Sequence, residues 1–310
     1  MPAVQIRPFR RADRDQVTAL VNAHAAAVVP GVAASVNAVL SQFEREPGEV
    51  IVDPWVAERR ALVAEQDGGI AAAALVVRYR DDPDVGPGYR GDGEIRWLLF
   101  RPEAPAGNPF WHDGWDAARA LVAACLQQMT VWQVRRVGAD GALPVPGVYG
   151  VPAQWPHVER LYTEAGFAPP DDGVQIVHVA DLDRIPAPGG PPLDGLTVAR
   201  SVGVNGVRFT AALDGERVGL LEVEVLDGTE RHPRLGGLAD IGNLSVADGH
   251  RRRGVGTWLL AHAAAWLRLG HVDRLLSYAT PDETALIAFV ERHAFVELTR
   301  TRPGWIRDTP

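Results

Sequence analysis

Apolar and polar residues alternate in two stretches of the chain that are each interrupted by an Asp-Gly pair. The first, "RALVAEQDGGIAAAALVV", covers residues 60–77, and the second, "VRFTAALDGERVGLLEVEV", covers residues 207–225. Strand-like runs joined by Asp-Gly are typical of β-hairpins, because Asp and Gly accept the positive φ angles of the tightest hairpin turns. Each stretch is therefore predicted to form a strand, a tight turn and a second strand.

A helical period replaces this alternation in two other places. From Val255 onward, apolar residues that include Trp258, Leu259, Ala263 and Leu267 recur at a spacing that places them on one face of a helix. Such a stripe predicts a helix packed against a sheet. In the first half of the chain, "RRADRDQVTALVNAHAAAV" begins a long helical insert of residues 12–57, between the first two expected strands.

The two halves of the chain repeat each other in the same order. The hairpin of residues 60–77 matches that of 207–225, "EIRWLLF" (94–100) matches "DIGNLSV" (240–246), and "LYTEAGF" (161–167) matches "FVERHAF" (289–295). Three matches in one order indicate duplication of a structural unit. Only the second copy has a glycine loop before its helix, and at that place the first copy reads "RPEAPAGNPFWHDG".

A proline- and glycine-rich segment separates the copies. The stretch "RIPAPGGPPLDG", residues 184–195, has no apolar period and is typical of a linker. We therefore expect a first domain at residues 1–186, a linker at 187–195 and a second domain at 196–310.

Composition narrows the classes of function. The 310 residues include 31 basic residues, all of them arginine, so the lysine of a Walker loop, a Schiff base or a pyridoxal enzyme is missing. The net charge is −8 and the basic residues form one cluster instead of a broad face, which argues against a nucleic-acid partner. A single cysteine, Cys125, fits a reducing compartment. With no signal-peptide pattern and no apolar run of membrane-spanning length, the sequence predicts a cytoplasmic protein without a membrane partner.

The basic cluster lies at the start of the second helical stripe. The segment "ADGHRRRGVGTWLL" places three arginines and two glycines where the helix begins, and a helix start offers free N–H groups and a positive dipole end to an anion. A dinucleotide fingerprint would need a third glycine where Leu259 stands, and a Walker loop would need lysine. Both of these phosphate motifs are excluded.

The remaining pattern, Arg251-x-x-Gly254-x-Gly256 between a strand and a helix, resembles the acetyl-CoA loop of the GNAT acetyltransferase superfamily. The segment "DETALIAFVERHAF" is similar to that family's helix four and the strand after it. The resemblance implies an α/β (α+β) fold of two tandem GNAT-like domains, each a mixed, mostly antiparallel, twisted sheet flanked by helices. It also implies that the N-terminal copy is degenerate and has no cofactor loop.

The resemblance further implies the co-substrate and the residues that hold it. Acetyl-CoA is expected, with its pantetheine arm along the edge of strand four and its pyrophosphate on the loop and helix start. The residues that match these positions are Leu244, Ser245, Val246, Arg251, Arg252, Arg253, Gly254, Val255, Gly256, Thr257 and Asp282.

The residues for acid–base chemistry depart from the family pattern. Acetyl transfer to an amine needs a base, and the position of the family's strand-four glutamate holds Gly242. Asp240, two residues earlier, is the first candidate base, and Glu222 and Glu224 on the preceding strand are the others. The family's helix-four tyrosine is replaced by Val290, so Tyr278 at the end of the next strand is the nearest candidate acid.

The implied function is transfer of an acetyl group from acetyl-CoA to a primary amine of a small molecule or peptide, by direct attack in a ternary complex. The alternative is a catalytically inactive acyl-CoA-binding regulatory or scaffolding protein, which Gly242 and Val290 would explain. The nine histidines are scattered and form no metal motif, so no metal is expected. The chain is expected to be a monomer or a homodimer, with an N-terminal copy that shapes the acceptor site.

Overall fold

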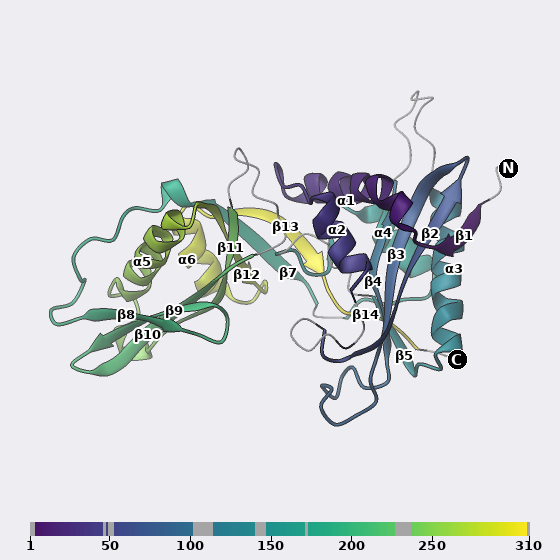
Figure 1. Ribbon diagram of the computed structural model, residues 1–310. Helices are drawn as coiled ribbons and strands as arrows, with labels where there is room; N and C mark the ends of the chain where they lie inside the picture. Colours follow the sequence, from purple (N-terminus) through teal and green to yellow (C-terminus); the bar gives the residue numbers. More distant parts are fainter. Residues whose placement is uncertain are drawn as a thin grey trace. The chain divides into compact units, whose positions relative to one another are not determined.

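The structure is a computed structural model that describes residues 4–45, 48, 53–101, 114–139, 147–170, 173–226 and 237–308. The chain divides into two compact units (Figure 1). Unit 1 comprises Met1–Val174 and Thr301–Pro310, and unit 2 comprises Gln175–Arg300. Each unit holds a mixed sheet flanked by helices, so the predicted fold class is confirmed.

Unit 1 is built on a six-stranded sheet in the order β1-β2-β3-β4-β5-β14. All neighbours are antiparallel except β4 and β5, which are parallel. The strands are β1 (Gln5–Pro8), β2 (Val56–Gln66), β3 (Gly69–Tyr79), β4 (Gly93–Phe100), β5 (Arg136–Ala139) and β14 (Trp305–Asp308). A two-residue strand, β6 (Val151–Pro152), pairs with Thr301 and Arg302.

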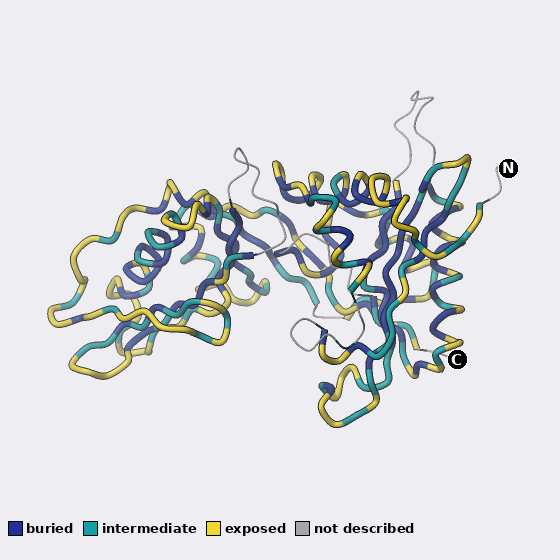
Figure 2. The backbone as a smooth tube through the Cα atoms, viewed as in Figure 1, coloured by how far each residue is buried: buried dark blue, intermediate teal, exposed yellow. Residues whose placement is uncertain are grey.

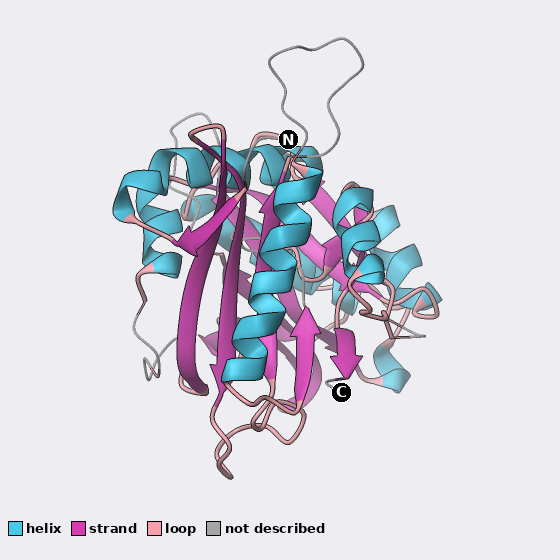
Figure 3. Ribbon diagram, turned by 90° about the vertical axis from the view of Figure 1, so that its right-hand side faces the viewer, coloured by secondary structure: helices cyan, strands magenta, loops and turns pink. Residues whose placement is uncertain are grey.

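Helices cover both faces of this sheet. The predicted insert after β1 contains a short 3-10 turn (Arg11–Asp13), α1 (Arg14–Val28) and α2 (Val36–Phe43). α1 and α2 lie on one face of the sheet, and α3 (Trp115–Val131) crosses the other face (Figures 1 and 3). α4 (Pro156–Glu164) follows β6. Cys125 on α3 is buried.

Unit 2 has its strands in the order β13-β7-β12-β11-β10-β9-β8, with β11 and β12 parallel. The strands are β7 (Gln175–Asp181), β8 (Thr197–Val202), β9 (Val207–Leu213), β10 (Glu216–Val225), β11 (Gly237–Val246), β12 (Val272–Ala279) and β13 (Val296–Arg302). Its helices are α5 (Val255–Leu269) and α6 (Thr284–Arg292), and two 3-10 turns cover Leu182–Arg184 and Asp248–His250.

The main core of unit 2 lies between its sheet and α5. The apolar stripe predicted from Val255 is buried there, with Leu259 and Ala263 fully enclosed (Figure 2). Val290 and Phe295 from the α6 region join the same core. Successive side chains along a strand point to opposite faces of the sheet. Leu238 and Leu276 are next to core residues Ala239 and Leu275 in the sequence, so they lie on the other face, where they form a smaller cluster.

Both predicted hairpins are confirmed. Asp67 and Gly68 join β2 to β3 with φ angles of 53° and 76°, and Asp214 and Gly215 join β9 to β10 with 51° and 85°. Two successive positive φ angles are the signature of a type I′ turn, whose twist matches that of the flanking strands.

The division of the chain differs from the expected boundaries at both ends of unit 2. β7 precedes the predicted linker, yet six of its residues pair with β12 in unit 2. β14 lies at the other end of the chain, yet all four of its residues pair with β5 in unit 1. Each copy's sheet is thus completed by a strand from the far side of a predicted boundary, which local apolar patterns do not reveal.

In the part of the chain that the structure describes, no helix is both long and apolar enough to cross a membrane.

Candidate functional site: a strand edge, a glycine loop and a buried carboxylate

In unit 2, the pairing of β11 with its parallel neighbour β12 ends part-way along β11. β11 and β12 pair from Gly237–Val272 to Asp240–Leu276, while β12 goes on pairing with β7 as far as Ala279. β11 meanwhile remains paired with β10 up to Val246. The pairing of the two parallel strands therefore ends directly after Asp240, and the β11 edge beyond it is not paired with β12.

A bulge at Gly242 sets the orientation of this edge. On β10, Glu222 and Val223 are consecutive, but their partners on β11 are Asn243 and Ile241, so Gly242 is the extra residue. A bulge shifts the alternation of the bulged strand. Before it, Ala239 and Ile241 face α5, and after it, Leu244 and Val246 pack on that side.

The backbone beyond the bulge directs hydrogen-bonding groups to the edge of β11 that does not face β10. The Ala247 N–H donates to Val218 O on β10, so by alternation the backbone groups of Leu244 and Val246 point to the other edge. One of these groups, the Val246 carbonyl, accepts a 2.9 Å hydrogen bond from Arg251 Nε. An extended chain such as a pantetheine arm can add to an edge of this kind like a further strand.

The loop between β11 and α5 is shaped to hold an anion. Arg252 has φ 60° and Gly254, the N-cap of α5, has φ 88°. Left-handed residues next to right-handed ones turn successive N–H groups inward, which makes a concave anion site at a helix N-terminus. No residue of the first helical turn is acidic, and Arg251, Arg252 and Arg253 are exposed.

The other residues predicted to hold acetyl-CoA lie at the start of α5, on β11 and before α6. Val255 is buried and anchors α5, while Thr257 donates to His293 Nε2 at 2.9 Å and ties the helix start to α6. Ser245 is exposed on β11, and Asp282 is exposed in the turn before α6. Gly256 lies against Phe289, 3.3 Å from the position that a Cβ atom would take.

Asp240 is a buried carboxylate at the point of strand separation. Its side chain lies on the sheet face opposite α5, as the alternation from Ala239 requires. Oδ2 accepts a hydrogen bond of 3.2 Å from Tyr278 Oη, and buried Oδ1 has no hydrogen-bond partner among the residues that the structure describes. Burial raises the pKa of Asp240 to about 6, helped by the charge of Glu224, and the Tyr278 hydrogen bond opposes the rise. A carboxyl group with such a pKa exchanges protons near neutrality.

The remaining two predicted carboxylates differ from each other. Glu224 lies opposite Asp240 on β10 and is exposed. Glu222 is 1% exposed, and its Oε1 accepts a 2.5 Å hydrogen bond from Arg208 Nε on β9. Burial alone would raise the pKa of Glu222, but the bonds from Arg208 and from the Asn205 backbone bring it below its usual value. A carboxylate committed in this way is a poor proton acceptor.

Sequence reasoning missed Asn205, which covers the bulge. A Cβ atom on Gly242 would lie 2.6 Å from Asn205 Cβ, and Asn205 Nδ2 donates to Gly242 O at 3.4 Å. Asn205 N also donates to Glu222 Oε2 at 3.3 Å. The turn between β8 and β9 thus occupies the space above position 242, where the family's strand-four glutamate would project. The only sequence signal is the short join "RSVGVNG".

Unit 1 repeats the strand geometry without the open edge. Among the described residues β4 and β5 pair from Gly93–Val137 to Ile95–Ala139, and a shift opposite Leu75 and Val76 makes Arg96 the extra residue. Glu94 therefore corresponds to Asp240. However, Trp97–Phe100 are at most 3% exposed, so this stretch of β4 is covered. The predicted absence of a cofactor loop concerns residues 102–113, which lie outside the described residues.

Comparison with known proteins agrees with this geometry. The model of the Acetyltransferase (GNAT) family matches residues 191–295, which include β11, the glycine loop and α5. The matched segment, about a third of the chain, is therefore similar to the GNAT family. No curated protein matches its sequence.

Solved structures show that the tandem GNAT fold spans the chain. A tandem GNAT protein from the clavulanic acid biosynthesis pathway is 17% identical, with a TM-score of 0.67 and 99% of each chain covered. A GCN5-related N-acetyltransferase from Sphaerobacter thermophilus is 17% identical, with a TM-score of 0.59, over 98% of this chain and 95% of that one. A glucosamine N-acetyltransferase region of a fungal multi-domain β-N-acetylglucosaminidase is 15% identical, with a TM-score of 0.62, over 98% of this chain and 38% of that one. At these identities the likeness concerns the fold.

Proposed function

We propose that unit 2 transfers an acetyl group from acetyl-CoA to the primary amine of a small molecule or peptide, by direct attack in a ternary complex. The observation that carries this proposal is the separation of β11 from β12 directly after Asp240. It brings an extended strand edge, a loop that favours anions and a carboxyl group with a raised pKa to one end of the sheet.

The residues present suit acetyl-CoA. The backbone of Leu244 and Val246 would hydrogen-bond the pantetheine arm, and the amides at the α5 start, with Arg252 and Arg253, would hold the pyrophosphate. Arg251 acts differently, because its bond to Val246 O and its 2.9 Å pair with Asp248 Oδ1 tie the loop to β11. The co-substrate supplies the activated acetyl thioester.

Asp240 is the base that we assign to the reaction. Its Oδ1 would take a proton from the acceptor ammonium, so that the amine nitrogen can bond to the thioester carbonyl carbon. As the carbon–sulfur bond breaks, the nitrogen loses its second proton and the departing thiolate takes up a proton, which gives the amide and the free thiol of coenzyme A. Tyr278 holds Oδ2 and fixes the orientation of the carboxylate. Exposed Glu224 adds negative charge that attracts a cationic acceptor.

We assign no cofactor to unit 1 and interpret it as a degenerate GNAT copy, because its β4 edge is covered. Cytoplasmic location and a monomer or homodimer remain our expectations from composition. The second candidate function is an inactive acyl-CoA-binding protein, favoured by the absence of a side chain at Gly242 and of a tyrosine at Val290.

The test is calorimetry with acetyl-CoA, followed by a free-thiol assay with amines, aminoglycosides, amino acids and peptide N-termini as acceptors. Binding with acceptor-dependent thiol release supports the acetyltransferase. Binding without release for every acceptor supports the inactive binding protein, and failure to bind acetyl-CoA contradicts both.

A further inference from the structure

A cavity of about 720 Å³ lies within unit 1. Its wall comes from the segment before β2, the end of β3, the loop between β3 and β4, the first half of β4, β5 and β14. The volume is within the range of about 300–1,000 Å³ typical of small-molecule sites. The acetyl transfer proposed for unit 2 makes no use of this cavity.

The cavity lies on the sheet face that corresponds to the face of Asp240 in unit 2. A Cβ atom on Gly93 would collide with the side chain of Met129 on α3, so Gly93 faces that helix. The next residue, Glu94, therefore points to the opposite face, as Asp240 points away from α5. Because Glu94 is part of the lining, the cavity is the unit 1 counterpart of the proposed acceptor position.

The carboxyl group of Glu94 has a different environment from that of Asp240. Tyr79 Oη donates to Glu94 Oε2, and Arg96 Nε lies 3.7 Å from the same oxygen. Arg96 in turn donates to Tyr79 Oη at 3.2 Å and pairs with Asp53 Oδ1 at 2.9 Å. Glu94 is thus bound into the wall of the cavity, and its counterpart Asp240 has a buried oxygen without a described partner.

Aromatic rings form much of the wall. Three of the five tyrosines of the chain line the cavity together with two tryptophans, the set being Trp55, Tyr79, Tyr89, Tyr149 and Trp305. Trp55, Tyr89 and Tyr149 are 38%, 50% and 47% exposed. Among the described phenylalanines, tyrosines and tryptophans, these three are the exposed ones, and all three line this cavity. Exposed rings around a cavity offer a large contact area to a ligand.

The rings are positioned before any ligand arrives. The centroid of the Tyr89 ring lies 5.9 Å from that of Trp55 and 5.2 Å from that of Tyr79. The loop that carries Tyr89 is held by Arg136, whose Nη2 donates to Asp92 Oδ2 at 2.7 Å and to a backbone carbonyl of the same loop at 2.6 Å. A wall fixed in this way loses little side-chain entropy when it binds.

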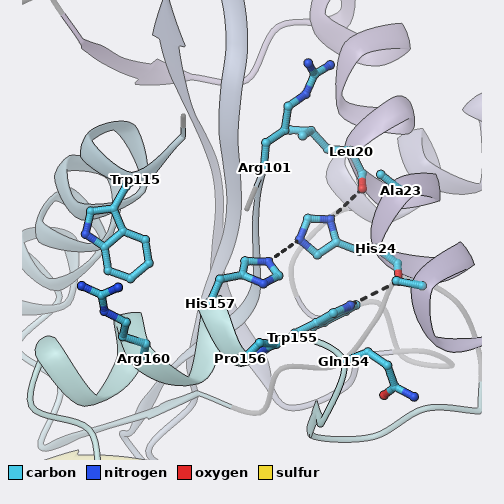
Figure 4. Close-up of a pocket in the computed structure, with 11 residues that line it drawn as sticks. Leu20, Ala23, His24, Arg101, Trp115, Gln154, Trp155, Pro156, His157 and Arg160 are labelled. Carbon is cyan, nitrogen blue, oxygen red and sulfur yellow. Dashed lines mark hydrogen bonds between the residues drawn. The ribbon is translucent and has the colours of Figure 1, made fainter. Parts of the chain in front are cut away.

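A smaller cavity between α1 and α4, of about 470 Å³, presents its rings differently (Figure 4). Trp155 is 2% exposed, and its Nε1 donates to His24 O at 3.2 Å. The Arg160 guanidinium lies over the Trp115 ring, 4.5 Å from its centroid. Because these rings are buried or covered by a side chain, stacking on a ligand is favoured in the larger cavity.

We propose that the larger cavity binds a small planar aromatic or heteroaromatic molecule, with its ring against Trp55 and Tyr89. Stacked and edge-to-face contacts between rings select a planar body. A cation would instead have to compete with Arg96 and Arg136 for the carboxylates of the wall.

The experiment is calorimetric titration of the full chain at pH 7.5 with 2-naphthol, decahydro-2-naphthol and (cyclohexylmethyl)trimethylammonium. The first two share a carbon skeleton and a hydroxyl group and differ in aromaticity, and the third is a cation without an aromatic ring. 2-Naphthol is expected to bind at least about tenfold more tightly than either of the others, since ring contacts contribute beyond the area that they bury. Equal or tighter binding of one of the others, or no binding of 2-naphthol, would overturn the proposal.

Variants locate the binding. Trp55→Leu keeps an apolar side chain and removes the ring, so 2-naphthol affinity should fall about tenfold or more. Trp132→Leu, at a partly exposed tryptophan outside the lining, is the matched control and should leave affinity unchanged. Unchanged affinity in Trp55→Leu contradicts the assignment.

A second variant serves if Trp55→Leu fails to fold. A Cβ atom on Gly138 of β5 would make ordinary contacts, 3.9 Å from Glu94 Cγ, so a side chain fits there and projects beside Glu94. Gly138→Phe should therefore fill the cavity and abolish binding. 2-Naphthol binding that survives Gly138→Phe contradicts the proposal.

Discussion

Tyr278 Oη donates a hydrogen bond of 3.2 Å to Asp240 Oδ2, across the first point at which β11 and β12 no longer pair. The bond leaves Oδ1 of a buried carboxylate available to another donor. Because the pKa of Asp240 is about 6, its protonation can be followed by measuring the rate and the stability as functions of pH.

Replacing Asp240 by Asn should remove the base and leave the acetyl-CoA loop intact. We expect kcat at pH 7.5 to fall by about 10²-fold or more, with an unchanged Kd for acetyl-CoA, as is usual for the loss of a general base. Steady-state kinetics and calorimetry measure the two quantities. Asp273→Asn, an exposed position on β12, is the matched control. A nearly normal rate in Asp240→Asn would move the role to Glu224 or to water.

The pH dependence of the rate should report Asp240. Because the base acts when ionised, kcat/KM should rise with pH, reach half its maximum near pH 6 and level off at higher pH. The Tyr278 hydrogen bond lowers the pKa of Asp240, so Tyr278→Phe should move the midpoint of the profile upward. A midpoint that stays in place or moves down would show that the profile belongs to another group.

Stability should depend on pH in the same range, with a definite sign. The folded-state pKa of Asp240 lies above the ordinary value of 3.8, so the folded chain binds more protons between the two values. The contribution of Asp240 to stability is therefore fully present below about pH 4 and is lost as pH rises through about 6. Asp240→Asn should remove this loss and be the more stable protein at pH 7.5, by about 1–3 kcal/mol. Thermal unfolding of both proteins from pH 4 to 8 is the measurement.

Glu222 should act through the turn that it holds and not through proton transfer. Glu222→Gln weakens the buried pair with Arg208, so we expect a loss of about 1–3 kcal/mol in unfolding free energy. Because the turn around Asn205 lies on the acceptor face, KM for the amine should rise more than kcat falls. Glu216→Gln, at an exposed position of β10 with no assigned role, is the control for the loss of one charge. A large fall in kcat with unchanged stability would instead make Glu222 a catalytic residue.

Acetyl-CoA binding should depend on the exposed arginines of the loop. We expect Arg252→Gln with Arg253→Gln to weaken acetyl-CoA binding about tenfold or more, and the remaining affinity to depend less on salt. Arg217→Gln on an exposed part of β10 should have no effect. Gly254→Val is a poorer test, because φ is 88° and a Cβ atom would lie 2.9 Å from Pro192 Cβ. An unchanged Kd in the double variant would contradict the placement of the pyrophosphate.

Whether a fragment of the chain folds should depend on which paired strands it retains and not on whether it begins at the predicted linker. A fragment of residues 190–310 lacks β7 and exposes the edge of β12, so it should aggregate or remain unfolded. A fragment of residues 175–300 retains the unit 2 core and should be soluble and show cooperative unfolding. Circular dichroism and size-exclusion chromatography compare the two. A stable, monomeric 190–310 fragment would show that β7 is dispensable.

Local patterns in the sequence predicted much of the fold and part of the site. Turn chemistry located both hairpins, and the helical stripe located α5, because these features depend on neighbours in the chain. Asp240 and Tyr278 were predicted singly, but their hydrogen bond joins residues 38 positions apart on parallel strands. Other features depend on which strands pair, and a local hydrophobic pattern does not predict strand pairing. These features are the partners of β7 and β14, the Gly242 bulge and the position of Asn205 over it.

The position of β14 in the chain also determines when the unit 1 sheet can be completed during synthesis. Because β14 follows all of unit 2 in the chain, the last strand of the unit 1 sheet leaves the ribosome only after both units' other strands. Until then β5 presents an unpaired edge, which is a template for association with other chains. A released chain that ends at residue 300 should therefore bind holdase chaperones through the β5 edge of unit 1, whereas the full chain, which has β14, should not.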